Sequence, residues 1–379
     1  MNGGRLRDRA GAEPSGGPLG VWCQAEAVRR GARSWLSGAA VARDERWGTG
    51  WVVRARAHKL LGQFDDVHRW ATRAAAAAQR HGWTDVVPNA LHLLGTVAQQ
   101  RGDVARVRTF NERALALFVE AEDDHGRIDA AWALAWAARQ RGDLGVAEKL
   151  LADAMGIAVA LADATEQGDC WRGLAQVAVR RGDFAAALVR ERAAVEAYER
   201  AGHRMGLVYA HNGAGEAVRF SGDLATAERA YRRALVVAEA VCTDEGVFPR
   251  MNLAFLLVVR GEHTQARAGV EEVIRVLERT GRRVFLFDAE LARLACLVGE
   301  GDEAGFRRAR PRIDRMVARR RVHERDAAMA AQRAGELLEE RGSLERAAWA
   351  YGIALAEWRG VGAEREVETV RAALARCEA

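Results

Sequence analysis

The sequence predicts an all-α protein built as an α-solenoid, in which antiparallel helix pairs stack side by side. Three observations support this fold class. Glycines recur through the 379-residue chain at separations of 40, 40, 40, 40, 39, 40 and 41 residues. Small and apolar residues follow these glycines at helical spacing, and the chain has only five prolines. The repeating glycines are Gly62, Gly102, Gly142, Gly182, Gly222, Gly261, Gly301 and Gly342.

The segments that follow the glycines predict one helix of each pair. Five, nine and twelve positions after Gly142 stand Ala147, Leu151 and Ala154. Steps of four and three place these residues on one helical face, because an α-helix turns once in about 3.6 residues. The same positions hold Ala227, Tyr231 and Ala234 in a second unit, and Ala347, Tyr351 and Ala354 in a third.

The segments that precede the glycines predict the other helix. Seven positions before the glycine they carry a small residue, which lets two helices approach closely. One helix pair cannot bury its own apolar face, so neighbouring pairs are expected to stack into an array of about eight units. The small residues are Gly95, Ala135, Ala175, Gly215, Ala254 and Gly335.

The repeating glycine is expected to form the turn within each pair. The tripeptide Arg-Gly-Asp, known elsewhere as a cell-adhesion signal, occurs there three times, beginning at Arg101, Arg141 and Arg181. Adhesion would need the aspartate, yet Glu262 and Ser343 replace it in other units while the glycine stays. We therefore expect a left-handed glycine that ends the first helix and a polar residue that caps the second. A looser connection is expected to lead to the next pair.

The two ends of the chain differ from the repeats. Residues 1–20 carry glycines and charges where a signal peptide needs an apolar stretch, and they predict a disordered leader. Residues 21–37 have the spacing of a lone second helix and predict a half-repeat. Repeats are expected over about 40–358, and residues 364–377 predict a closing helix within about 361–379.

One unit shows a recognisable signature. From Gly222 the chain reads Gly-Asp-Leu-Ala-Thr-Ala, followed by Tyr231, Ala234 and Leu235, with Gly215 upstream. This pattern resembles the tetratricopeptide repeat (TPR) family, and the resemblance extends over about residues 40–358. It implies a right-handed superhelix of helix pairs without catalytic residues.

The sequence also departs from the family pattern. Its period of 40 residues exceeds the usual value of about 34 and is similar to the long repeats of bacterial regulatory proteins. The proline that commonly ends the second helix is missing. The unit around Gly301 is degenerate, because Phe306 and Arg310 occupy positions of small and aromatic residues.

The resemblance implies a concave groove lined by the first helix of each pair, where family members hold peptides or partner helices. Trp132 and Trp136 are prominent there, since aromatic and arginine side chains dominate interface energies. The alternative is that the longer repeat buries both tryptophans between units. The groove residues implied are His92, Thr96, Gln99, Gln100, Trp132, Trp136, Arg139, Gln140, Arg172, Gln176, Arg180, Asn212, Glu216, Arg219, Phe220, Met251 and Phe255.

The sequence contains no motif for catalysis or for cofactor binding. Neither Lys59 nor Lys149 completes a phosphate-binding Walker loop, and zinc-protease, serine-hydrolase and kinase signatures are missing. Five scattered cysteines without a C-x-x-C pair favour a reducing cytoplasm over a disulfide framework or a zinc site. Apolar runs such as 254–259 are too short to cross a bilayer. We therefore predict no enzyme activity, cofactor or membrane partner.

Two further clusters leave alternatives open. His58, Asp65, Asp66 and His68 have metal-ligand side chains, but they flank the Gly62 turn, where solvated side chains are the simpler interpretation. The run 306–325 has nine arginines against two acidic residues. It lacks interleaved aromatic residues, so a solvated helix face or an acidic-protein contact is favoured over nucleic-acid binding.

These observations predict a non-catalytic scaffold for protein–protein interaction. Two arginines besides Arg139, namely Arg172 and Arg219, would flank the groove tryptophans, which suits a partner with apolar anchors and acidic groups. The alternative is a sensory or regulatory module that acts in trans on a bacterial signalling kinase or regulatory ATPase, or that responds to a small effector. The sequence predicts neither the identity of the partner nor the oligomeric state.

Overall fold

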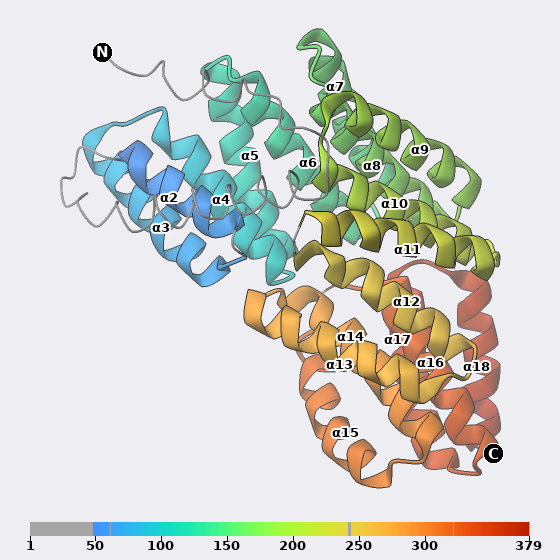
Figure 1. The fold of residues 1–379 in the computed structure, drawn as a ribbon. Coiled ribbons are helices and arrows are strands. Elements are labelled where there is room, and N and C mark those ends of the chain that lie inside the picture. The colour runs from blue at the N-terminus through green and yellow to red at the C-terminus, as the bar shows by residue number, and fades with distance from the viewer. Residues whose placement is uncertain (1–47, 61, 242–243, 321, 379) are drawn as a thin grey trace.

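The computed structural model of the protein describes residues 48–60, 62–241, 244–320 and 322–378 (Figure 1). The predicted leader 1–20 and half-repeat 21–37 lie outside the described residues. Over the described ranges the chain forms α-helices and one short 3₁₀ turn and contains no strand, which confirms the all-α prediction. None of these helices is long and apolar enough to cross a membrane.

The helices follow one another in antiparallel pairs. From α2 onward, each even-numbered helix up to α16 is the first of a pair, the following odd-numbered helix is the second, and α18 comes last. The elements are α2 (Gly48–Leu60), α3 (Phe64–His81), α4 (Val86–Gln100), α5 (Val104–Glu120), α6 (Asp124–Arg141), α7 (Leu144–Ala160), α8 (Ala164–Arg181), α9 (Phe184–Ala201), α10 (Arg204–Phe220), α11 (Leu224–Ala240), η2 (Asp244–Gly246), α12 (Val247–Val259), α13 (His263–Thr280), α14 (Arg283–Glu300), α15 (Glu303–Val317), α16 (Arg325–Glu340), α17 (Leu344–Gly360) and α18 (Glu364–Glu378).

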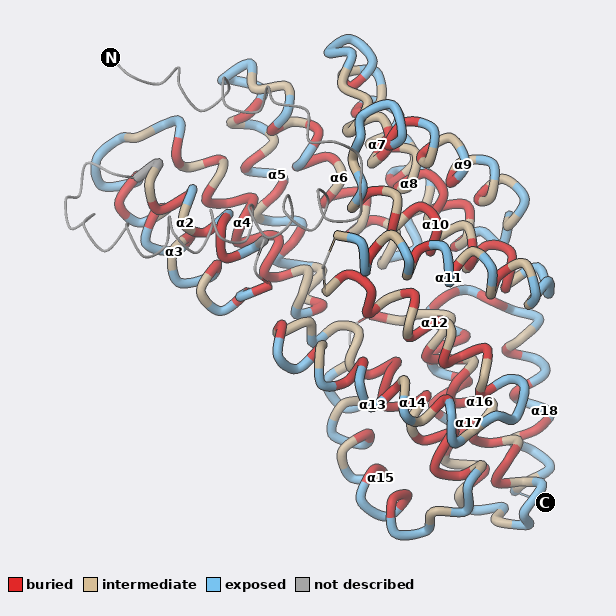
Figure 2. The backbone as a smooth tube through the Cα atoms, viewed as in Figure 1, coloured by how far each residue is buried: buried red, intermediate tan, exposed pale blue. Residues whose placement is uncertain are grey.

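The second helix of each pair buries the face that the sequence predicts. Ala147, Leu151 and Ala154 of α7 are at most 1% exposed. Buried residues line the inner sides of the helices, and exposed residues line the outer sides (Figure 2). The core therefore lies between the stacked pairs as a series of clusters, as expected for a solenoid.

Small residues in the first helix allow the two helices to meet. A Cβ atom added to Gly215 would lie 2.5 Å from the ring of Tyr231, and one added to Gly335 would lie 2.6 Å from the ring of Tyr351. Both tyrosines are at most 1% exposed. Glycine at these positions therefore makes room for a buried tyrosine from the second helix, because any larger residue would overlap the ring.

The turn within each pair is a left-handed cap. Gly142 has φ of +83°, its N–H donates to the carbonyl oxygen of Arg139, and the Asp143 N–H donates to the carbonyl oxygen of Ala138. These two hydrogen bonds satisfy carbonyls that the end of α6 leaves without a helical partner. Positive φ recurs at every glycine of the series that begins at Gly62 and ends at Gly342.

The aspartates after these glycines differ in their role. Asp103, Asp183 and Asp223 each accept a hydrogen bond from the main-chain N–H three residues later, which caps the second helix. Asp143 makes no such bond and instead pairs with Arg141 at 3.2 Å. Ser343 also makes no cap bond. Glu262 makes no cap bond either, so the expected side-chain cap is wrong at Asp143, Glu262 and Ser343.

The connections between pairs are tighter than the sequence suggests. Three residues separate the end of α5 at Glu120 from the start of α6 at Asp124. A residue with positive φ forms this turn as well. Glu122, between α5 and α6, and Ala162, between α7 and α8, both have φ of +52°, and Gly82, between α3 and α4, has φ of +68°. The expectation of a looser connection is wrong here, because both ends of each of these helix pairs are closed by a compact left-handed turn.

The solenoid curves so that units far apart in the sequence contact each other. In Figure 1 the chain runs from α2, past α9, and back to α13, α14 and α15. A Cβ atom added to Gly62 would lie 3.3 Å from Thr280 of α13, and one added to Gly102 would lie 3.2 Å from Val322. The C-terminal units therefore pack against the turns of the N-terminal units.

Candidate functional site

A hollow opens between the first helices α6 and α8. Trp132 and Trp136 lie one turn apart in α6, Arg139 follows near its end, and Gln176 of α8 forms the other side. The hollow is shallow, with a volume of about 10 Å³, which is room for about one water molecule. Its remaining lining residues are Ala135, Leu151, Gly173 and Val177.

The two tryptophans both pack between units and border the hollow. Trp132 contacts a core cluster that contains Leu151 and Leu174, and Trp136 contacts a second cluster that contains Val107. Both indoles are half-buried. The Nε1–H of Trp132 has no acceptor among the described residues. The indoles thus form an apolar wall, and the Trp132 Nε1–H is buried behind it.

Arg139 is the cation of this hollow. It is half-buried, and its side chain makes no ion pair or hydrogen bond with any residue that the structure describes. Its neighbour Gln140 is engaged, because its amide donates to Glu324 Oε1 at 3.1 Å. The guanidinium of Arg139 can therefore bind a carboxylate brought by a ligand.

The groove residues deeper in the array bind one another. Asn212 donates to Glu216 Oε1 at 2.8 Å, and Asn252 donates to Asn212 Oδ1 at 2.9 Å and to Glu216 Oε1 at 3.0 Å. Burial, together with the charge of Asp326, raises the pKa of Glu216 to about 7. This network pairs most of its polar groups internally and leaves Asn252 Oδ1 buried without a hydrogen-bond partner among the described residues.

Arg172 belongs to the same buried layer. Its guanidinium lies 4.5 Å from the ring centre of Tyr209 and 3.4 Å from Asp169. Glu191 of α9 is 4% exposed, and burial raises the pKa of its carboxyl well above the usual range. Arg172 is therefore held inside the array, 13% exposed at its side chain, although the sequence places it beside the groove tryptophans.

Arg219 and Phe220 are covered by the C-terminal units. Arg219 is 4% exposed and forms an ion pair with Asp326 of α16. Burial lowers the pKa of the Arg219 guanidinium, but Asp326, together with Tyr231 and Glu216, outweighs burial and raises it. Phe220 stacks on Phe184 at 5.5 Å between ring centres, and Arg325 lies over both rings. Arg219 is therefore closed to a partner in this structure, whereas Phe220 is half-buried beneath Arg325.

The segment that covers them crosses the C-terminal ends of α6, α8 and α10. We define residues 322–326 as the crossing segment. Arg180, 8% exposed, donates to the carbonyl oxygens of His323 and Gly360, both at 2.8 Å. The chain itself therefore fills the part of the groove that lies near Arg180 and Arg219.

The remaining groove residues lie at various depths. His92 is 8% exposed, its Nδ1 lies 3.0 Å from Asn111 Oδ1, and burial lowers its pKa. Thr96, Met251 and Phe255 are buried, whereas Gln99 and Gln100 are half-buried. The structure thus brings Trp132, Trp136, Arg139 and Gln176 together around one hollow and places the other implied groove residues outside it.

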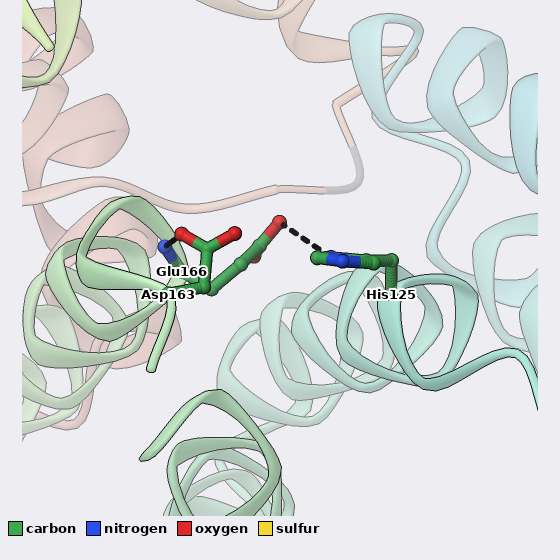
Figure 3. Close-up of side chains that lie close together, drawn as sticks. All are labelled: His125, Asp163 and Glu166. Atoms are coloured by element: carbon green, nitrogen blue, oxygen red, sulfur yellow. Dashed lines mark hydrogen bonds and ion pairs between the residues drawn. The ribbon is translucent and has the colours of Figure 1, made fainter. Parts of the chain in front are cut away.

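Three metal-ligand side chains meet between the starts of α6 and α8 (Figure 3). One ligand atom from each of His125, Asp163 and Glu166 lies within 4.8 Å of the others. Burial, together with Asp129, Asp169 and Asp163, raises the pKa of Glu166 to about 8. Asp163 already accepts from the Thr165 and Glu166 N–H groups as a helix cap, which leaves one carboxylate oxygen for an ion. A divalent cation could bind here only after the side chains draw closer.

The cluster at the Gly62 turn is divided between other partners. His58 Nδ1 lies 2.7 Å from Gln63 Oε1 and 3.7 Å from Asp66 Oδ2. Asp65 instead pairs with Arg101 at 3.0 Å. His68 makes no hydrogen bond or ion pair to a described residue of this cluster.

The arginine run 306–325 divides into paired and exposed members. Arg312 pairs with Glu278 and Glu290, Arg320 pairs with Asp288 and Glu357, and Arg310 lies over Trp349 at 5.2 Å. Arg307, Arg308, Arg315 and Arg319 are exposed.

Comparisons with known proteins agree with this architecture. Residues 86–160 match the family model of the tetratricopeptide repeat. No curated protein sequence matches the chain. A Rap protein complexed with Competence and Sporulation Factor aligns with a TM-score of 0.65 and 14% identity, over 95% of this chain and 99% of its own. Residues 86–160 therefore carry a tetratricopeptide repeat, which supports the family resemblance there, and the described chain has the α-solenoid fold of this structure, which confirms the predicted fold class.

Two further solved structures share the fold. A Rap conjugation gene regulator in complex with the Phr* peptide aligns with a TM-score of 0.62 and 13% identity, over 91% of this chain and 97% of its own. Aspartyl phosphate phosphatase F from Bacillus subtilis aligns with a TM-score of 0.57 and 11% identity, over 95% of each chain. At this level of identity the likeness establishes the fold alone.

Proposed function

We propose that the protein is a non-catalytic scaffold that binds a peptide or a protein segment in the hollow between α6 and α8. The observation that carries the proposal is the combination of Trp132, Trp136 and an unpaired Arg139 around one opening. Aromatic and arginine side chains of this kind form the energetic centres of interfaces. A second opening beside Trp83 offers one indole instead of two.

The lining defines the chemistry of the occupant. An apolar side chain would lie against the indoles of Trp132 and Trp136, and a carboxylate would pair with Arg139. The amide of Gln176 can bind main-chain or side-chain oxygens of the occupant. Two solved structures with this fold hold ligands, Competence and Sporulation Factor in one and the Phr* peptide in the other, which supports a peptide occupant.

A selection experiment tests the proposal. The purified protein selects from a library of random linear peptides, and the selection is repeated with Arg139→Glu, which changes charge and leaves the tryptophans in place. We expect wild-type selection to enrich peptides that combine an acidic residue with an apolar one, and Arg139→Glu to lose the acidic preference. Arg204→Glu, on an exposed arginine of α10, is the matched control and should select as wild type does.

A second variant tests the apolar wall. Trp132→Ala combined with Trp136→Ala should abolish recovery of the selected peptides, because it removes most of the apolar contact surface. A melting temperature close to that of Arg139→Glu would show that the variant folds. Selection that is unchanged by both the charge reversal and the double substitution would rule out the hollow as the binding site.

The alternative is a regulatory module that acts in trans on a signalling enzyme or responds to a small effector. A signal transduction ATPase from Pyrococcus horikoshii that carries a TPR sensor supports this alternative through its similar fold, with a TM-score of 0.52 and 14% identity over 92% of this chain. This chain spans 55% of that protein. A small molecule that raises the melting temperature of the purified protein, while peptides do not, would favour the alternative.

A further inference from the structure

The outer face of α15 carries arginines whose side chains form no hydrogen bond or ion pair with the residues that the structure describes. Arg307 and Arg315 lie eight residues apart on one helical face with Pro311 between them, about 12 Å along the axis. Arg308 lies beside them, and Arg319 follows just after the helix end. All four arginines are exposed, and none makes a hydrogen bond or an ion pair with a described residue. We call these four residues the α15 arginine face.

The acidic residues around this face are engaged elsewhere. Glu303 pairs with Arg346 at 2.7 Å, and Asp314 accepts from the indole N–H of Trp349 at 2.9 Å. Asp302 caps α15 through the Gly305 N–H and pairs with Arg267 at 3.0 Å. Asp302 attracts Arg308 without forming an ion pair with it, and the side chains of Arg307, Arg315 and Arg319 have no ion-pair partner among the described residues.

The packing of α15 explains why this face is free. Phe306 and Trp349 meet edge to face at 5.9 Å, and Ala309 and Ile313 are buried, so only one side of α15 contacts the array. The chain then leaves through the crossing segment instead of a compact left-handed turn. The opposite side of α15 therefore remains open along its length (Figure 2).

The chemistry of the face favours a protein over a nucleic acid. The nearby aromatic rings are covered, because Arg310 lies over Trp349 and Arg346 lies over Phe306. No exposed ring among the described residues of α15 is left for a base to stack on. Between the arginines stand Pro311, which is exposed, and Val317, which is 38% exposed. Arginines mixed with apolar groups match the composition of protein interfaces.

We propose that the α15 arginine face is a second docking surface, and that it binds an acidic segment of a partner protein. Guanidinium groups pair with carboxylates in bidentate geometry, so a row of aspartate or glutamate side chains complements the row of arginines. The face lies on the second helix of its pair, whereas the hollow at Trp132 lies between first helices. Both sites can therefore be filled at the same time.

The test measures binding of a fluorescent, helical peptide of about 20 residues made of glutamate, alanine and leucine, a length that spans the helix face. The variant carries Arg307→Gln, Arg308→Gln, Arg315→Gln and Arg319→Gln. We expect its dissociation constant to rise by ~10-fold or more, because four exposed ion pairs are lost. The matched control changes the same net charge at four other exposed arginines, Arg80, Arg192, Arg204 and Arg371. This control should change the dissociation constant by less than ~2-fold, because long-range attraction by net charge contributes less than direct pairing with the peptide.

Three outcomes would overturn the proposal. One is an equal loss in the variant and in the matched control, which would show that net charge alone attracts the peptide. Another is tighter binding of a duplex DNA of about 20 base pairs, lost in the variant, which would assign the face to nucleic acid. The third is the absence of peptide binding by the wild type. Arg139→Glu should leave this binding unchanged, so failure here is separate from failure of the proposed hollow.

Discussion

The guanidinium of Arg180 in α8 donates a hydrogen bond of 2.8 Å to the carbonyl oxygen of Gly360 in α17, which lies 180 positions further along the chain. A second donor of the same group binds the carbonyl oxygen of His323 at 2.8 Å. One buried side chain therefore fastens the crossing segment and the end of α17 to the middle of the array.

Replacing Arg180 tests the strength of this attachment. Arg180→Met leaves two partly buried carbonyl oxygens without this donor, and we expect the free energy of unfolding to fall by about 2 kcal/mol or more in urea denaturation. Scattering in solution should show a larger radius of gyration as the units separate. Arg192→Met, on an exposed arginine of α9, should change neither quantity. Equal stability of the two variants would contradict the attachment.

The left-handed turns predict opposite effects of alanine at two glycines. Gly142 has φ of +83°, and no atom lies within 4 Å of the place that an added Cβ atom would take, so Gly142→Ala should cost about 1 kcal/mol through backbone strain alone. Gly156 lies in the exposed interior of α7 with equal space, so Gly156→Ala should stabilise by about 0.5–1 kcal/mol. Thermal or urea unfolding measures both. A stabilising Gly142→Ala would refute the turn assignment.

The caps predict a difference between two aspartates in the same tripeptide. Asp183 accepts from the Ala186 N–H at 2.9 Å, so Asp183→Ala should lower the free energy of unfolding by about 1 kcal/mol. Asp143 makes only an exposed ion pair with Arg141, so Asp143→Ala should cost less than about 0.5 kcal/mol. Urea unfolding of the two variants side by side is the measurement, and equal losses would argue against the difference in capping.

The raised pKa of Glu166 predicts a dependence of stability on pH. Burial and three neighbouring carboxylates move this pKa from 4.5 to about 8, so between these values the folded chain keeps a proton that the unfolded chain releases. Stability is therefore lost as the pH rises through this window. Glu166→Gln should melt at a higher temperature than wild type near pH 8.5, and the difference should vanish near pH 4. Glu196→Gln, on an exposed side of α9, should show no such difference.

The repeat unit could be predicted from the sequence because its signals are local. Gly142 requires positive φ, Gly215 leaves room for Tyr231, and Leu151 follows helical spacing, so each position reports on its own helix pair. The capping role of Asp143 could not be predicted, since the same three letters surround Asp183, which does cap. The outcome there depends on a side-chain rotamer rather than on residue type.

The open part of the groove could be predicted only partly. The register of Trp132 and Trp136 within one helix identifies them as groove residues, and they border the hollow. The covering of Arg219 could not be predicted, because it depends on how far the array curves over many units and not on any local pattern. Arg180 is indistinguishable in sequence from other arginines near the end of a first helix, such as Arg139, which stays unpaired among the described residues.

The crossing segment also changes how stability is distributed along the molecule. In an ordinary linear array each unit contacts only its neighbours, so the ends can unravel while the middle stays folded. Here Asp326 and His323 attach late units to Arg219 and Arg180 in the middle. Fraying of the last units must break these bonds as well, so the terminal and central helices are expected to unfold together as one cooperative block.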